Sequence, residues 1–242
     1  MEDGLELDTL TRVAASIKAA AAKAGVAIVA GDTKVIGGHG GLYINTAGFG
    51  VVETALDISV HRAQDGDAVL ISGRLGNHQA CVQSGRLGIE NQIKSDCAPL
   101  NAMVLGLLAA EVTVHTLRDI TRGGLASVLN EIAEGSGVGI ALQGGLTLAD
   151  EQVQGFCDIL GLDPLYMTNE GKLVAIVPEL EAERALAVLR AAPYGEHAQI
   201  IGSVRACGKL TVTIRTTAGG TRRVEALQGE SLPRICQAIL KQ

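Results

Sequence analysis

The chain has 242 residues, of which 47% are apolar and 19% charged, and its formal net charge is −6 at pH 7. This composition excludes intrinsic disorder, because it supplies enough apolar surface for a core. Three Tyr, two Phe and no Trp exclude aromatic platforms for single-stranded nucleic acid, and the acidic balance argues against phosphate-backbone binding. The longest apolar runs are shorter than the roughly 20 residues that a membrane-spanning helix needs. We expect neither nucleic acid nor membrane as a partner.

Cysteine usage and the N-terminal residues indicate the compartment. The five cysteines are widely spaced and none belongs to a CxxC pair, so a zinc or iron–sulfur site has no local support. The opening residues are acidic and lack the pattern of a signal peptide. Both features favour reduced thiols in a cytoplasmic protein.

The first part of the chain predicts a small helix-and-strand piece. Its expected elements, in chain order, are a helix over 10–24, a strand over 26–30 and a strand over 42–52. Asp8 is the expected cap at the start of the helix, and Gly25 the cap at its end. The glycine-rich stretch 37–41 is interpreted as a hairpin connection. Because such a piece cannot close a core alone, we expect it to pack on a second domain or on another chain.

After a domain boundary near residues 55–65, helical and strand patterns alternate to the end of the chain. This alternation is typical of an α/β or α+β fold. The expected helices lie near 77–84, 100–110, 123–134, 149–160 and 179–191, and the expected strands near 68–72, 138–142, 172–177, 198–205 and 209–216.

Two polar segments are candidates for binding phosphate. Asp32, Thr33 and Lys34 follow the strand predicted over 26–30, where a carboxylate can hold Mg²⁺ and a lysine can touch phosphate. By spacing alone, an ordinary strand-to-loop exit with solvated charges is the more frequent explanation of so short a motif. The segment 115–124 reads as a polar loop with two arginines that enters a helix at two glycines, which suits an anion. The alternative is a capping loop in which Asp119 or Thr121 satisfies the first helical turn.

Three single residues are candidates for catalysis. His78, between a strand and a helix, suits a base or a phosphate contact, although a lone loop histidine is more often simply hydrogen-bonded. Glu170 precedes a strand and suits a general base or a plain turn carboxylate. Cys236, next to Arg234 and Ile235, lies near the C-terminus, where a thiol can reach into a site or simply pack as a small apolar residue.

Five segments, taken in order, resemble the HypE family of hydrogenase maturation factors, the carbamoyl dehydratases. They are residues 31–35, 95–101, 118–124, 169–172 and 233–236. The Pro-Arg-Ile-Cys ending is highly specific to that family. The Arg-Asp-x-Thr-Arg-Gly-Gly loop is also similar to that of aminoimidazole ribonucleotide synthetase, selenophosphate synthetase and thiamine phosphate kinase.

The resemblance implies a domain plan and an activity. The plan is the remainder of an N-terminal ATP-binding and dimerisation domain over 1–58, a complete C-terminal α/β domain of the aminoimidazole ribonucleotide synthetase type over 59–230, and a tail over 231–242. By the resemblance, the partner HypF places a carbamoyl group on Cys236, and ATP with Mg²⁺ serves to dehydrate it to a thiocyanate. The cyanide then passes to iron on a HypC–HypD complex for [NiFe]-hydrogenase, and the protein is expected to be a homodimer.

The resemblance also implies residue roles. Cys236 is the carrier nucleophile. Glu170 is the candidate base, and His78 is the second candidate for that role. Arg234 orients the tail or the transferred phosphate. Asp32 is the expected Mg²⁺ ligand, with Thr33 and Lys34 beside it. The residues expected to line the anion site are Arg118, Asp119, Thr121, Arg122, Gly123 and Gly124.

The sequence departs from the family pattern at both ends. Family members carry a further N-terminal stretch with Thr-Asp-Ser and Asn-Asp segments, and here six residues follow Cys236. We therefore expect an N-terminally truncated form that binds Mg-ATP weakly by itself. Two alternatives remain open: a non-catalytic fragment that keeps only partner-binding surfaces, or another ATP-dependent synthetase of the same superfamily.

Overall fold

The structure is a computed structural model that describes residues 1–52, 56–206, 210–216 and 218–227. The chain divides into two compact units, Met1–Leu56 and Asp57–Gln242, and each is described by itself. In the parts of the chain described, no helix is both long and apolar enough to cross a bilayer.

Unit 1 contains one helix, α1, which spans Leu7–Ala24. It ends at Gly25, which adopts a φ of 66° and donates its N–H to carbonyls of the last turn, as a helix-terminating glycine does. The N-cap residue is Glu6 and carries no side-chain cap, so the predicted capping role of Asp8 is wrong. Asp8 lies one residue inside the first turn, where a carboxylate still interacts favourably with the helix dipole.

The two strands predicted in unit 1 are not formed. Residues 26–30 and 42–52 have no regular secondary structure, and the pairing recorded among the described residues of this unit is one bridge between Glu2 and Ile36. A β-strand needs a hydrogen-bonded neighbour, whereas an apolar, β-branched sequence supplies only the propensity for one. The apolar side chains of both segments are largely exposed.

The glycine-rich stretch 37–41 encloses a carboxylate and does not turn a hairpin. Oε2 of Glu2 accepts the backbone N–H groups of His39 and Gly41, each at 2.9 Å, and Oε1 accepts the Tyr43 hydroxyl at 3.0 Å. The N–H of His39, followed by the other two donors, holds the pKa of Glu2 below its usual value. A Cβ on Gly38 would lie 2.3 Å from the Glu2 side chain, so only glycine fits this close approach.

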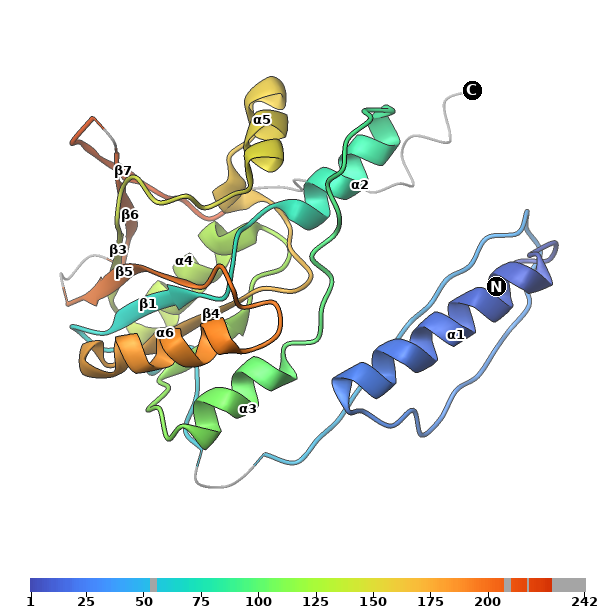
Figure 1. The fold of residues 1–242 in the computed structure, drawn as a ribbon, viewed down its shortest axis with the longest axis horizontal. Coiled ribbons are helices and arrows are strands. Elements are labelled where there is room, and N and C mark those ends of the chain that lie inside the picture. Colours follow the sequence, from blue (N-terminus) through green and yellow to red (C-terminus); the bar gives the residue numbers. More distant parts are fainter. Residues whose placement is uncertain (53–55, 207–209, 217, 228–242) are drawn as a thin grey trace. The chain divides into compact units, whose positions relative to one another are not determined.

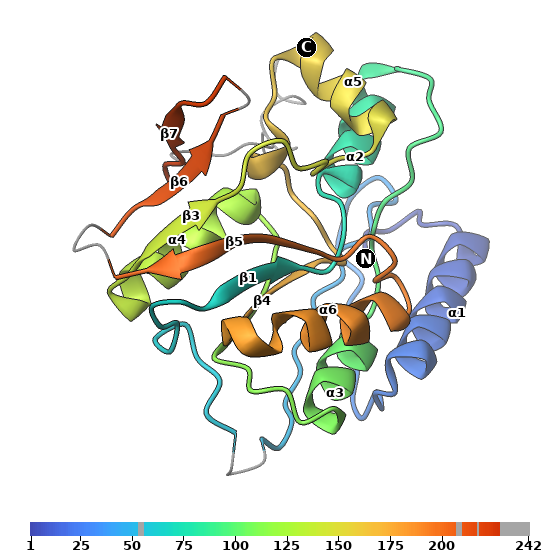
Figure 2. The same cartoon turned by 60° about the vertical axis from the view of Figure 1, so that its left-hand side comes forward.

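Unit 2 is built on a seven-stranded sheet in the order β2-β4-β1-β5-β3-β6-β7 (Figure 2). Neighbouring strands are antiparallel, except that β3 and β6 are parallel. The strands are β1 (Ala68–Ile71), β2 (Thr116–Asp119), β3 (Gly139–Leu142), β4 (Leu173–Val177), β5 (Gln199–Arg205), β6 (Val212–Arg215) and β7 (Thr221–Arg223). This mixed sheet with helices confirms the predicted α/β (α+β) class.

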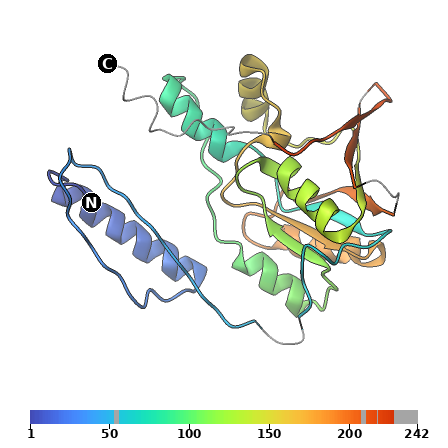
Figure 3. The same ribbon diagram turned by 180° about the vertical axis from the view of Figure 1, so that it is seen from behind.

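The helices of unit 2 are α2 (Asn77–Leu87), α3 (Asn101–Ala109), α4 (Gly124–Ser136), α5 (Glu151–Leu160) and α6 (Ala182–Ala191), with short 3₁₀ turns η1 (Pro164–Tyr166) and η2 (Glu179–Glu181). Helices α2 and α5 pack against each other in a small core of their own. Helix α4 covers one face, while α3 and α6 cover the other (Figures 1 and 3). Alternate residues of β1 divide between the two cores: Val69 and Ile71 pack with α4, and Leu70 packs with α3 and α6.

Two strands of unit 2 were missed by the sequence patterns. Residues 116–119, interpreted as part of a polar loop, form β2 at one edge of the sheet, paired only with β4. An edge strand exposes polar side chains, and here only Thr116 of the four residues is fully buried, so the usual apolar alternation is lost. The same reason applies to β7, whose three residues are all exposed.

Candidate functional site

The loop from β1 into α2 is joined to the segment before β4 by a buried asparagine. Asn169, which has no exposed surface, accepts the backbone N–H of Gly76 at 2.8 Å and donates to the carbonyl of Met167 at 2.9 Å. Gln79 and Thr168 add two more hydrogen bonds beside it, at 2.8 and 3.2 Å. Because every partner is buried, these bonds fix the two loops in one arrangement.

Two of the four predicted catalytic residues, His78 and Glu170, bind consecutive residues of a third segment, His78 through its side chain and Glu170 through its backbone N–H. Nδ1 of His78, in the first turn of α2, lies 2.9 Å from the Ser95 hydroxyl. The backbone N–H of Glu170 donates to Oδ1 of Asp96 at 3.0 Å. The structure therefore brings His78 and Glu170 into one loop cluster, although 92 positions of sequence separate them. The Glu170 side chain is exposed, so its carboxylate is accessible to a reacting group.

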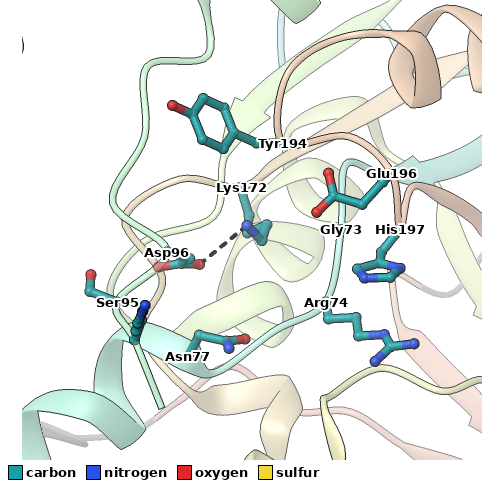
Figure 4. A pocket seen from close by; sticks show the side chains of 10 residues that line it. Gly73, Arg74, Asn77, Ser95, Asp96, Lys172, Tyr194, Glu196 and His197 are labelled. Carbon is teal, nitrogen blue, oxygen red and sulfur yellow. Dashed lines mark ion pairs between the residues drawn. The ribbon is translucent and has the colours of Figure 1, made fainter. Parts of the chain in front are cut away.

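A pocket of about 170 Å³ lies beside this cluster (Figure 4). Charged and polar side chains line it, and Lys172 and Asp96 face one another across it. The lining residues are Gly73, Arg74, Asn77, Lys94, Ser95, Asp96, Lys172, Tyr194, Glu196 and His197. A second hollow, of about 320 Å³, shares Asn77 and Lys94 with it.

An ion pair fixes one wall of the pocket. Arg74 lies 2.5 Å from Oδ1 of Asp150, the residue that caps α5, and Asn77 donates to Oδ2 at 3.0 Å. Burial alone would raise the pKa of the Asp150 carboxyl, but the hydrogen bonds from Asn77 and Arg74 outweigh it and hold the pKa below its usual value. Asp150 therefore stays ionised and positions Arg74.

The predicted anion loop runs from β2 into α4. Arg118 pairs with Glu131 at 2.7 Å and lies 3.7 Å from Asp119, so two carboxylates already neutralise its charge. Arg122 is exposed. Helix α4 has no side-chain cap, so neither Asp119 nor Thr121 performs the capping role that was the alternative interpretation.

The glycines of this loop are required by its conformation and packing. Gly123 and Gly124 have φ values of 82° and 65°, which L-residues with side chains rarely adopt. A Cβ on Gly124 would also lie 2.4 Å from the Leu165 carbonyl oxygen. Both glycines are buried, so the contacts recorded for them are with neighbouring chain segments. Their contact with an anion stays a prediction.

The Mg²⁺ position predicted at Asp32 lies in unit 1. Oδ2 of Asp32 is 3.9 Å from Nζ of Lys34, and both side chains are exposed, as is Thr33. Among the described residues there is no group of three or more His, Cys, Asp or Glu arranged to hold a metal. Mg²⁺ is usually held by one or two carboxylates together with substrate phosphates and water. One carboxylate paired with a lysine fits the ion only if a nucleotide supplies further oxygens.

Cys236 and Arg234 lie outside the described residues, as does Cys207. The described cysteines are all free: Cys81 is partly buried, Cys97 exposed and Cys157 buried. Burial, with smaller contributions from Asp158 and Asp163, raises the pKa of the Cys157 thiol to about 11. Cys157 is therefore unreactive at neutral pH.

The sequence analysis assigned no role to several residues that line the pocket beside Glu170 and His78, above all Asp96 and Lys172. Both stand in segments that were singled out for the resemblance, 95–101 and 169–172, so a signal was present. That signal marked the segments without showing that the two side chains meet.

Comparison with known proteins first defines the class. The profile of the family described as "AIR synthase related protein, C-terminal domain" matches residues 64–215. This range covers the seven-stranded sheet except β7, with all of its covering helices. The chain thus contains a C-terminal domain of the AIR synthase-related type.

Similarity over almost the whole chain defines the family more narrowly. The chain is 47% identical to carbamoyl dehydratase HypE of Azotobacter vinelandii over 240 residues, which are 98% of this chain and 70% of that protein. It is 39% identical to carbamoyl dehydratase HypE of Escherichia coli, with the same two coverages. The chain therefore belongs to the HypE family, whose members are named as enzymes.

Solved structures agree with this assignment. A crystal structure of hydrogenase maturation protein HypE superposes with a TM-score of 0.86 at 44% identity, covering 98% of this chain and 77% of that one. A HypE structure in complex with ATP gives 0.83 at 40% identity, covering 96% and 72%. A HypE–HypF complex gives 0.81 at 36% identity, covering 94% and 75%.

Proposed function

We propose that this chain carries a carbamoyl group on Cys236 and dehydrates it to a thiocyanate at the expense of ATP, as a step of [NiFe]-hydrogenase maturation. The observation that carries the proposal is the 47% identity to a carbamoyl dehydratase over 98% of the chain. The solved HypE complexes with ATP and with HypF support ATP as the second substrate and a HypF-type carbamoyltransferase as the donor.

The reaction follows from the chemistry of a primary amide. Its oxygen is a poor leaving group, so the γ-phosphoryl group of ATP is transferred to it and ADP departs. The C–O bond then breaks, phosphate leaves with that oxygen, and the nitrogen loses two protons as the C≡N bond forms. A base must accept a nitrogen proton, and cations must hold the phosphates.

Within this scheme the described residues take specific parts. Glu170 is the base, because its carboxylate is exposed while its backbone is held. His78 in the same cluster is the second candidate for this role. The loop from Arg118 to Gly124 binds the phosphates at the uncapped start of α4. Asp32, Thr33 and Lys34 of unit 1 contact Mg²⁺ and phosphate, and Arg234 orients the tail. The cyanide acceptor is iron on a HypC–HypD complex in the cytoplasm.

We further propose that unit 1 forms a homodimer. Its extended segments expose large apolar side chains, with Phe49 and Val51 at 96% and 100% exposure and Val29 at 77%. A second copy offers the same apolar segments and the missing strand partners. Sedimentation equilibrium tests the proposal: a dimer is expected, and a strict monomer at high micromolar concentration contradicts it.

Peptide mass spectrometry tests the carrier assignment. The protein is incubated with a HypF-type carbamoyltransferase, carbamoyl phosphate and ATP, and the modified cysteine is then located. We expect the carbamoyl group on Cys236 alone, and none in Cys236→Ala. The exposed Cys97 makes Cys97→Ala the matched control, which should remain fully carbamoylated. Carbamoylation that persists in Cys236→Ala contradicts the assignment.

The six residues after Cys236 are tested in the same experiment. A parallel sample carries a stop codon in place of Gln237. If only the shortened chain is modified, the extension blocks the reaction, and the mechanism holds although the full chain does not perform it.

A further inference from the structure

Asp96 is a buried carboxylate that only partly satisfies its hydrogen-bonding capacity. Its side chain is 4% exposed, and Oδ1 accepts the backbone N–H of Glu170 at 3.0 Å. Within the described part of the chain, Oδ2 has no hydrogen-bond partner. The nearest cation is Lys172, whose Nζ lies 3.7 Å from Oδ2 and whose side chain is 11% exposed (Figure 4).

The ion pair of Asp96 and Lys172 adds little to the stability of the fold. A charge-assisted hydrogen bond spans roughly 2.7–2.9 Å, so at 3.7 Å the two groups attract each other without making one. Folding removes both charged groups from water, and replacing a buried ion pair with apolar residues is often neutral or stabilising. A buried polar group left without a partner calls for another explanation, such as a role in the site.

The contacts around the pair converge on Glu170. Its N–H donates to Asp96, and its carbonyl accepts the N–H of Ala98 at 3.4 Å, so both backbone groups of Glu170 are held by one short segment. The next residue, Gly171, approaches so closely that a Cβ would lie 1.9 Å from the Asp96 carbonyl oxygen. Nζ of Lys172 donates to the Gly171 carbonyl at 3.2 Å.

We propose that Asp96 is a positioning residue for Glu170 and that Lys172 holds the Asp96 carboxylate in place by charge. We call Asp96, Lys172 and the hydrogen bond to Glu170 the Glu170 clamp. The backbone of Glu170 is fixed on both sides while its carboxylate stays exposed, so the clamp sets the point from which the side chain reaches out. This inference rests on the proposed role of Glu170 as the base.

The clamp matters because proton transfer depends steeply on position. A base must lie within hydrogen-bond reach of the proton it removes, and a misplacement of about 1 Å costs up to about 100-fold in rate. Loosening the backbone of Glu170 should therefore lower kcat for dehydration without changing the KM for ATP. The acceptor atom, more than the charge of Asp96, makes the bond to Glu170, so an amide oxygen at the same position should largely replace it.

The test compares Asp96→Ala with Asp96→Asn in the full chain. Amide hydrogen exchange is read at Glu170, and kcat and KM for ATP are measured in the carbamoyl dehydration assay. Asp65→Ala is the matched control, because Asp65 also accepts a loop N–H, that of Ala206 at 2.7 Å, and does not line the pocket.

We expect Asp96→Ala to speed exchange at the Glu170 amide at least tenfold and to lower kcat about 10- to 100-fold, with the KM for ATP unchanged. Asp96→Asn should restore both quantities to within a few-fold, and Asp65→Ala should change neither. If Asp96→Ala does not fold, Lys172→Met provides the test: it removes the cation that holds the Asp96 carboxylate, so exchange at the Glu170 amide should quicken and kcat should fall with the KM for ATP unchanged.

Three results overturn the inference: normal exchange or normal kcat in Asp96→Ala, an Asp96→Asn variant as slow as Asp96→Ala, or wild-type exchange and kcat in Lys172→Met. Glu170→Gln separates this failure from that of the proposed function. A fully active Glu170→Gln removes the base assignment itself, and the inference with it. An inactive Glu170→Gln beside a fully active Asp96→Ala refutes the clamp alone.

Discussion

Asn169 should be among the most costly polar side chains to remove from unit 2. Asn169→Ala takes away the acceptor of the Gly76 N–H and the donor to the Met167 carbonyl, and Asn169 has no exposed surface through which water could replace them. A buried polar group left without a partner costs about 1–3 kcal/mol, so two of them destabilise the fold by about 2–6 kcal/mol.

Asn91 provides a matched control on the surface. Its side chain also accepts one backbone N–H, from Ile93 at 2.9 Å, and donates to one carbonyl, of Ile89 at 3.1 Å, but the residue is exposed. Water takes over both bonds in Asn91→Ala, so we expect a loss within about 0.5 kcal/mol.

The assay is urea unfolding followed by circular dichroism, with linear extrapolation of the free energy of unfolding to water. Asn169→Ala should lower the midpoint at an unchanged slope, by far more than Asn91→Ala does. Equal losses of free energy in the two variants would refute the conclusion that burial makes the Asn169 bonds structural.

Three further predictions concern a glycine, a thiol and a carboxylate. Gly124→Ala should destabilise the fold by several kcal/mol more than Gly137→Ala in the same urea assay. Both glycines have a positive φ, but only at Gly124 would a Cβ clash with the backbone, 2.4 Å from the Leu165 carbonyl oxygen. At pH 8, iodoacetamide should modify the exposed Cys97 within minutes. The buried Cys157, whose pKa is raised to about 11, should stay unmodified until urea unfolds the chain, and equal labelling of the two thiols in the native state contradicts this. The lowered pKa of Glu2 means that its contact with the glycine-rich stretch favours the ionised form, so the contact is complete above the ordinary pKa and is lost as the pH falls through the lowered value. The protection factors of the amides in residues 37–41, which compare each exchange rate with the intrinsic rate at the same pH, should therefore fall in acid in the wild type, and a Glu2→Gln variant should show no such pH-dependent step.

The elements of unit 2 could be predicted where apolar periodicity reports burial. Strand β4 is buried at all five positions and α4 carries a broad apolar face, and both were expected within a few residues of their observed bounds. Edge strand β2 escaped because its exposed side chains are polar. The strands expected at 26–30 and 42–52 failed because sequence reports strand propensity, whereas a strand exists only beside a partner.

The residues of the candidate site likewise divide into those that the sequence predicted and those that it did not. His78 was chosen as a reactive residue type after a predicted strand and Glu170 as one before a predicted strand, and the structure brings both to one loop cluster. Asp96 and Lys172 were not chosen, because charged residues in loops usually lie in solvent and the sequence does not show that these two are buried together. Their proximity depends on how the segment before α3 crosses the segment before β4, which is a property of the tertiary fold.

The most direct test of this account follows the carbamoyl group on Cys236 in wild-type protein and in Glu170→Gln. Both proteins are incubated with a HypF-type carbamoyltransferase, carbamoyl phosphate and ATP, and the Cys236 peptide is weighed over time. The account predicts that the wild-type peptide gains a carbamoyl group and then loses the mass of one water, whereas the Glu170→Gln peptide stops at the carbamoyl form. Dehydration at the wild-type rate in Glu170→Gln, or a carbamoylated wild-type peptide that never loses water, would contradict it.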